Sequence, residues 1–184
     1  MRWFLVLAFI LSVSIEAAFN VGGYVPFGPS TQRDTEGGTN AFAFDPMIGV
    51  NALIPIPGLN HVFLPEFDIV LNGSGADGYS KNTLLFLVDV GYIINPKFIF
   101  RYGVGTVMTI ISGDGETLQL PNGDGTSDYY QPSESATSWN TTLNFGVEYG
   151  IDQNYSVRFQ TYLFSFLSST SRKLSYSLSL SYYL

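Results

Sequence analysis

The side chains of this 184-residue chain that could carry chemistry are a few acids and arginines set among apolar residues. Asp89 and Arg101 flank one short turn-forming sequence, and Glu148 and Arg158 flank another. Residues placed about equally far from a hairpin turn face each other across the two strands or along their diagonal. Each pair therefore predicts an ion pair between neighbouring strands.

Strand alternation places these residues and three more acids on the face that otherwise carries small polar side chains. If the strands close into a narrow barrel, as argued below, an isolated charge inside it is costly. We therefore expect these side chains to form salt bridges with one another and to fill the interior as a polar plug. The competing hypothesis is a narrow conduit whose ion pairs exchange partners, and the excess of acids would make it prefer cations. The predicted lumen ion-pair cluster is Asp45, Glu66, Asp68, Asp89, Arg101, Glu148 and Arg158.

Other chemistries have weaker support. His61 is the only histidine, and it follows a short turn, which is the wrong end for a lipid-modifying site that pairs His with Ser or a carboxylate. Residues 121–128 offer oxygen ligands but lack the acidic first position and final Glu of a calcium loop. With no cysteine available for thiolate chemistry, we expect no catalytic residues, no metal and no cofactor.

The composition limits the class of protein. Hydrophobic residues make up 46% and charged residues 12%, yet no apolar run beyond the N-terminus approaches the roughly 20 residues of a membrane helix. The net charge of −7 argues against binding a phosphate backbone. The apolar character must therefore be spread over short strands.

The first 18 residues resemble a secretory signal peptide. Arg2 supplies the positive start, residues 3–15 the apolar segment, and Ala17-Ala18 the small residues at the cleavage site. Cleavage after Ala18 would place Glu16 where a small residue is preferred, so cleavage after Ala17 is the rival. A retained anchor helix is the other alternative, although its apolar segment is short. We expect a mature domain over 19–184.

Eight apolar and β-branched segments follow, separated by Gly, Asn, Asp, Ser and Pro. Their connections alternate between long and short, as in outer-membrane barrels with short periplasmic turns and long extracellular loops. Pro46 and Pro65 should cause bulges or shortened pairing, because proline lacks a ladder donor. The predicted strands are 19–28, 41–55, 61–72, 83–95, 98–112, 138–152, 155–168 and 173–184.

Each segment has one apolar face. Leu143, Phe145 and Val147 alternate with Asn144 and Gly146, and the last segment alternates Leu and Tyr with Ser. A soluble barrel would carry many outward charges, which are lacking here, so it is the less favoured alternative. The sequence predicts an all-β fold: a closed, antiparallel, eight-stranded up-and-down transmembrane β-barrel.

This pattern resembles the small outer-membrane barrels of the OmpA transmembrane domain and OmpX type, and OmpW more loosely. Members end in an insertion signal with alternate apolar residues, which Leu178, Leu180 and Tyr182 match; the terminal Leu184 departs from the usual aromatic. The resemblance implies a multi-pass protein of the Gram-negative outer membrane with both termini periplasmic. Its implied partners are outer-membrane lipid, lipopolysaccharide and, during insertion, the barrel-assembly machinery.

The functional prediction is a structural or surface-interaction barrel. Loop 113–137 contains no Lys or Arg and would present an acidic patch outside the cell. A narrow cation-preferring channel is the alternative, and an enzyme acting on lipid A is a third class. The residues of the predicted acidic loop are Asp114, Glu116, Asp124, Asp128 and Glu134.

Overall fold

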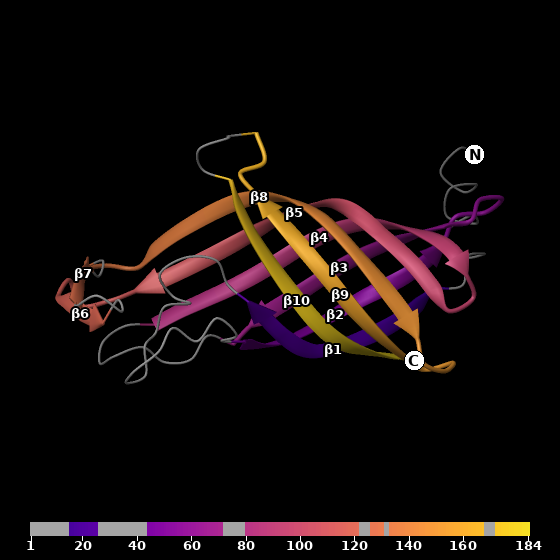
Figure 1. Cartoon of the computed structure of the whole chain (residues 1–184), viewed down its shortest axis with the longest axis horizontal. Helices are drawn as coiled ribbons and strands as arrows, with labels where there is room; N and C mark the ends of the chain where they lie inside the picture. The colour runs from indigo at the N-terminus through magenta and orange to yellow at the C-terminus, as the bar shows by residue number, and fades with distance from the viewer. Residues whose placement is uncertain (1–14, 26–43, 72–79, 122–125, 131–132, 168–171) are drawn as a thin grey trace, which may run out of the picture.

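The computed structural model describes residues 15–25, 44–71, 80–121, 126–130, 133–167 and 172–184 (Figure 1). Eight long antiparallel strands close into one barrel, and two short strands form a separate two-stranded sheet. The strands are β1 (Glu16–Val25), β2 (Asp45–Pro55), β3 (His61–Val70), β4 (Ser80–Asn95), β5 (Phe98–Ser112), β6 (Thr117–Pro121), β7 (Thr126–Tyr130), β8 (Ala136–Gly150), β9 (Tyr155–Phe164) and β10 (Lys173–Tyr183).

Barrel closure joins the first strand to the last. The strand order is β1-β10-β9-β8-β5-β4-β3-β2, and β1 pairs with β10 from Ala18↔Tyr183 to Val25↔Tyr176. Every pairing is antiparallel, and apart from the inserted β6 and β7 each strand pairs with its neighbours along the chain. The predicted closed eight-stranded barrel is confirmed.

The strand bounds agree with the predicted segments to within a few residues. The segment 98–112 matches β5, whereas β9 ends at Phe164, four residues before the predicted end. Predicted strand residues 26–28, 41–43, 72 and 168 lie outside the described residues.

The three short turns lie together at one end of the barrel with the strand termini Glu16 and Tyr183. Lys97 N–H donates to Asn95 Oδ1 at 2.9 Å in the β4–β5 turn, and Asn154 N–H donates to Asp152 Oδ1 at 2.8 Å in the β8–β9 turn. The turn β2–β3 is fastened to β4 by Ile93 N–H donating to the Asn60 carbonyl at 2.9 Å. Side-chain acceptors two residues back are the ordinary way in which Asn and Asp stabilise tight turns.

At the opposite end, β4, β5 and β8 extend beyond the other strands. These three have 15 or 16 residues, whereas the other barrel strands have 10 or 11. Beyond them the predicted loop 113–137 contains the β6–β7 hairpin, paired from Thr117↔Tyr130 to Pro121↔Thr126 (Figure 1). This segment was predicted to be loop throughout, and the hairpin corrects that prediction.

Side chains alternate between the two faces of the wall as predicted. On β8, Phe145 is 45% exposed on the outside, whereas Asn144 is fully buried inside. On β10, Leu178 and Leu180 are exposed while Ser179 and Ser181 are buried. The outer wall is therefore apolar and the inner face polar on these strands.

The inner face of β2 to β5 differs from the expectation of small polar residues. Large apolar side chains fill the barrel nearer its loop end, because the inward positions of these strands on the loop side of Glu66 and Asp89 are mostly apolar. This apolar core group consists of Tyr24, Met47, Val70, Leu85, Leu87, Val107 and Tyr162.

Proline shortens one strand pairing, as predicted for Pro65. The β2–β3 ladder runs from Met47↔Val70 to Asn51↔Glu66 and resumes at Ile54↔Phe63, so that the two positions opposite Leu64 and Pro65 are not paired. Pro46 stands at the second residue of β2, where its carbonyl accepts a bond from Leu71 N–H at 2.7 Å.

β1 begins inside the segment assigned to the signal peptide. Glu16, Ala17 and Ala18 pair with Leu53, Ala52 and Asn51 of β2. Cleavage after Ala17 or Ala18 remains a prediction. No helix long and apolar enough to cross a membrane occurs among the described residues.

Candidate functional site: an ion-pair cluster in the barrel lumen

Six ionisable side chains meet inside the barrel, and all are buried. They come from five consecutive strands of the barrel order, β9, β8, β5, β4 and β3, each at an inward position of the alternation. The lumen ion-pair cluster, as observed, consists of Glu66 and Asp68 of β3, Asp89 of β4, Arg101 of β5, Glu148 of β8 and Arg158 of β9.

Arg101 contacts three carboxylates. Its Nη2 lies 2.7 Å from Glu66 Oε2 and 3.5 Å from Asp89 Oδ2, and its Nη1 lies 2.9 Å from Glu148 Oε2. The pair predicted between Asp89 and Arg101 is therefore present, although it is the longest of the three. The planar fork of the guanidinium allows one arginine to join three strands.

Arg158 contacts Glu66 across the lumen. Its Nη2 lies 2.5 Å from Glu66 Oε1, and its Nη1 donates to Oε2 at 2.8 Å. β3 and β9 are four strands apart in the eight-stranded order, so this bond spans the barrel. The Glu66 carboxylate on β3 therefore contacts both arginines of the cluster.

The predicted pair between Glu148 and Arg158 is wrong. The two residues are direct register partners on β8 and β9, as expected. The carboxylate of Glu148 nevertheless bonds to Arg101, and the guanidinium of Arg158 bonds to Glu66. From the sequence, only contacts between neighbouring strands of a hairpin could be predicted. Closure of the barrel brings Glu66, on the opposite wall, within reach of Arg158.

Neutral side chains complete the hydrogen bonding of two carboxylates. Ser156 donates to Glu148 Oε1 at 2.6 Å, and the Tyr183 hydroxyl donates to the same oxygen. Asn144 and Gln160 donate to the two oxygens of Asp89 at 3.0 and 2.8 Å. These neutral partners were not predicted from the sequence, although the alternation of side chains along each strand already placed them on the inward face.

Glycines in the wall make room for two of the carboxyl groups. A Cβ at Gly49 would lie 1.8 Å from Asp68 Oδ1, and one at Gly103 would lie 2.4 Å from Asp89 Oδ1. No side chain could stand at either position without displacing the acid. These carboxyl groups therefore lie flat against the neighbouring strand.

The remaining predicted lumen residue, Asp45, lies elsewhere. It is the first residue of β2, is half-buried and pairs with Tyr24 at the loop end of the barrel. Met47, the next inward residue of β2, belongs to the apolar core group and stands between Asp45 and the level of Gly49.

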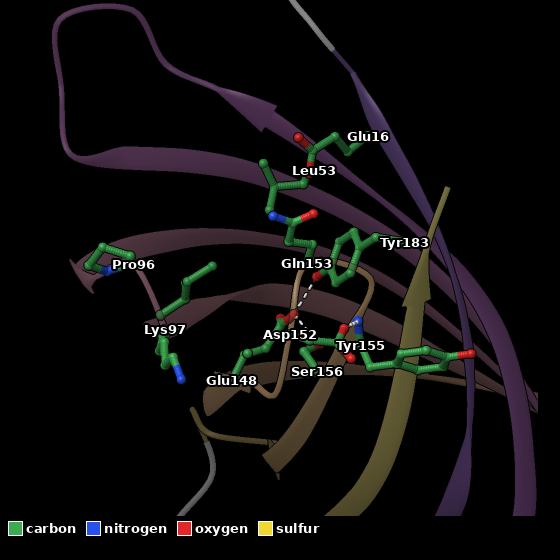
Figure 2. A pocket seen from close by; sticks show the side chains of 12 residues that line it. Glu16, Leu53, Pro96, Lys97, Glu148, Asp152, Gln153, Tyr155, Ser156 and Tyr183 are labelled. Carbon is green, nitrogen blue, oxygen red and sulfur yellow. Dashed lines mark hydrogen bonds between the residues drawn. The ribbon is translucent and has the colours of Figure 1, made fainter.

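The short-turn end of the barrel contains a pocket of about 120 Å³ (Figure 2). Turn residues such as Lys97 and Asp152 line it together with Glu16 of β1. Glu148 and Tyr183 also line it, so the pocket reaches the edge of the lumen cluster.

His61 lies near this end of the barrel, as expected, and its ring contacts Tyr92 with 5.2 Å between centroids. Two more aromatic pairs, Phe98–Tyr149 and Tyr155–Tyr182, lie near the same turns. The described residues contain no group of three or more His, Cys, Asp or Glu arranged to hold a metal ion.

The predicted surface residues are only partly described. Asp114 Oδ1 accepts the Glu116 backbone N–H at 3.0 Å, and Glu134 is exposed. Asp128 lies in β7, whereas Asp124 is outside the described residues. Of the C-terminal residues, Leu178, Leu180, Tyr182 and Leu184 are all exposed on the outer wall.

The ion pairs of the lumen cluster link strands on opposite sides of the barrel. Every carboxylate except that of Asp68 has either an arginine or at least two donors within 3.0 Å. Removing one member of a buried ion pair leaves an uncompensated charge, which costs about 3–5 kcal/mol.

No protein-family model matches the chain. No curated protein matches it either. Among solved structures, the Yersinia pestis outer membrane protein Ail in a phospholipid bilayer nanodisc matches with a TM-score of 0.50 at 12% identity, covering 93% of this chain and 100% of that chain.

Two other solved barrels match over similar lengths. The N-terminal β-barrel domain of Pseudomonas aeruginosa OprF matches with a TM-score of 0.46 at 9% identity, covering 94% of this chain and 100% of that chain. Neisserial surface protein A matches with a TM-score of 0.46 at 13% identity, covering 94% of this chain and 98% of that chain. The likeness to Ail and the closed eight-stranded sheet establish the class by fold. The chain has the fold of the small eight-stranded outer-membrane β-barrels.

Proposed function

We propose that this protein is an outer-membrane barrel with a structural or surface-interaction role, whose lumen is closed by its ion pairs. The contact between Glu66 and Arg158 carries the proposal, because it joins opposite walls of the barrel at 2.5 Å. The apolar core group fills the lumen nearer the loop end. An eight-stranded barrel is only wide enough for side chains to fill it, so two filled levels would leave no path for solutes.

The placement in a membrane follows from the outer wall. Phe19, Val21 and Val104 are each more than half exposed, and such a surface would be costly in water. Aromatic pairs near the short turns suit the headgroup region. With short turns on the periplasmic side, β1 would begin and β10 would end in the periplasm.

The proposed contacts follow from the same placement. The outer wall would contact outer-membrane lipid and lipopolysaccharide, and the alternation Leu178-Leu180-Tyr182 would be recognised by the barrel-assembly machinery. Asp114, Glu116 and Glu134, near the far ends of β5 and β8, would face the cell exterior as part of an acidic surface.

Two measurements test the proposal. A closed barrel should migrate differently on SDS gels before and after boiling, and planar bilayers containing the refolded protein should stay silent. Discrete openings in the wild type would contradict the closed lumen. Unchanged migration on boiling would contradict the barrel itself.

A narrow cation-preferring channel is the second candidate. Four buried acids face two buried arginines in the cluster, and the pocket at the short turns reaches Glu148. On this alternative, cation-selective openings should change when Arg101 or Arg158 is replaced by Gln. The same bilayer recordings therefore separate the two candidates.

A further inference from the structure

Asp68 differs from the other acids of the lumen cluster in how little stabilises its charge. Its side chain is fully buried on the inward face of β3. Asn20 Nδ2 lies 3.5 Å from Oδ1, at the outer limit of a hydrogen bond, and Oδ2 accepts no hydrogen bond from the described residues. An ionised carboxylate in this position would be poorly compensated.

The comparison with Asp89 makes the difference clear. Asp89 is equally buried but receives bonds from Asn144 and Gln160 at 3.0 and 2.8 Å, and Arg101 lies 3.5 Å away. Both arginines direct their Nη atoms at other acids, and Arg158 uses both of its own on Glu66. Asp68 is left without a close cation in the cluster.

The neighbour of Asp68 on the same inward face of β3 is Glu66, two residues away, and both side chains are buried. Two ionised carboxylates at adjacent inward positions of a buried strand face would repel each other, which disfavours the charged form of one of them. Glu66 is held as an anion by two guanidinium groups. We propose that Asp68 holds a proton in the folded barrel while Glu66 stays ionised, which makes Asp68 a proton-binding site in the lumen.

The other groups around Asp68 agree with a neutral acid there. On the two strands next to β3, the register partners of Asp68 are Gly49 of β2 and Leu85 of β4, and Asn20 of β1 is uncharged. The ionisable groups that face it are Glu66, Arg158 and Tyr162, whose hydroxyl bonds to Ser177 at 2.9 Å. The inference concerns the cluster of the proposed function and rests on that lumen being closed to bulk water.

The proposal fixes how stability depends on pH. The unfolded chain has Asp68 ionised above about pH 4, whereas the folded barrel keeps it neutral, so that folding takes up one proton. The contribution of neutral Asp68 to the free energy of unfolding is therefore present at low pH and is lost as the pH rises. The folding equilibrium constant should fall about tenfold per pH unit from this group alone, until Asp68 ionises in the folded barrel.

Infrared spectroscopy of the refolded full chain in lipid vesicles tests the proton directly. The wild type at pH 7 should show the carbonyl stretch of a neutral carboxylic acid, shifted in heavy water. Asp68→Asn should remove that band, and Asp89→Asn, which alters an equally buried carboxyl, should keep it. A band that survives Asp68→Asn, or no band in the wild type, would overturn the proposal.

Stability provides the second readout and guards against a variant that fails to fold. Asn is neutral and has nearly the shape of the protonated acid, so Asp68→Asn should remain heat-modifiable on gels and should lose the tenfold dependence per pH unit that the wild type shows. An unchanged pH dependence would overturn the proposal. The infrared measurement is also repeated with sodium chloride in place of choline chloride in the buffer. If the neutral-acid band of the wild type disappears in sodium, a bound cation occupies the site and the proposal is overturned.

These outcomes are independent of the bilayer recordings. A conducting wild type that keeps an acid band assigned to Asp68 would defeat the closed lumen alone. A silent barrel without the band would defeat the proton site alone.

Discussion

Replacing Glu66 by Gln tests the lumen cluster at its centre. The carboxylate receives Arg101 Nη2 at 2.7 Å and Arg158 Nη1 and Nη2 at 2.8 and 2.5 Å, and all three side chains are buried. The amide removes the negative charge and turns an N–H group toward guanidinium groups. Arg101 keeps Glu148, whereas Arg158 loses the carboxylate that both its Nη atoms contact.

The expected loss in the free energy of unfolding is about 3–5 kcal/mol, the usual cost of leaving a buried charge without its partner. Urea titration of the protein in lipid vesicles measures it through Trp139, the only tryptophan after residue 18. Glu134→Gln is the control, because Glu134 is an exposed acid and its change should stay within about 0.5 kcal/mol.

A second substitution separates charge from packing. Arg158→Met in the Glu66→Gln background removes the uncompensated cation and should restore part of the loss, which a double-mutant cycle measures as coupling. A loss below about 1 kcal/mol for Glu66→Gln would refute the reasoning, since it would mean that bulk water reaches the cluster.

Two further predictions concern the wall. Gly49→Ala should lower stability by about 1–3 kcal/mol in the same titration, because its Cβ would meet Asp68 Oδ1 at 1.8 Å, whereas Gly150→Ala, with no atom closer than 3.8 Å, should change it little. Val147→Lys on the exposed outer wall should cost about 2–4 kcal/mol in a bilayer, and Glu134→Lys should cost almost nothing; equal effects of the two lysines would argue against a lipid-facing wall.

Much of the fold was predictable because it depends on local, periodic signals. The 98–112 segment alternates apolar and small residues, and it is β5 from end to end. The Asn95-Pro96-Lys97 turn was found because its residues suit a tight turn. The β6–β7 hairpin was missed, since its strands have five residues each and carry no long alternation.

The composition of the cluster was predictable, but its pairing was not. Parity alone placed Glu66, Asp68 and Arg158 inside the barrel. The partner of Arg158 depends on which strand lies across the lumen, and that follows from closure of the whole sheet. The apolar core group was missed for a related reason: a strand apolar on both faces, such as the stretch Leu84 to Val88 in β4, does not show which residues point inward.

The contact between Glu66 and Arg158 also has a consequence for the order of assembly. The two residues are 92 positions apart in the chain, and their atoms meet only after the sheet has curled far enough to bring β3 opposite β9. An interaction that forms after the rate-limiting step slows unfolding and leaves the folding rate almost unchanged. The buried cluster would then act as a latch on the finished barrel, and would govern how long it persists in the membrane rather than how quickly it inserts.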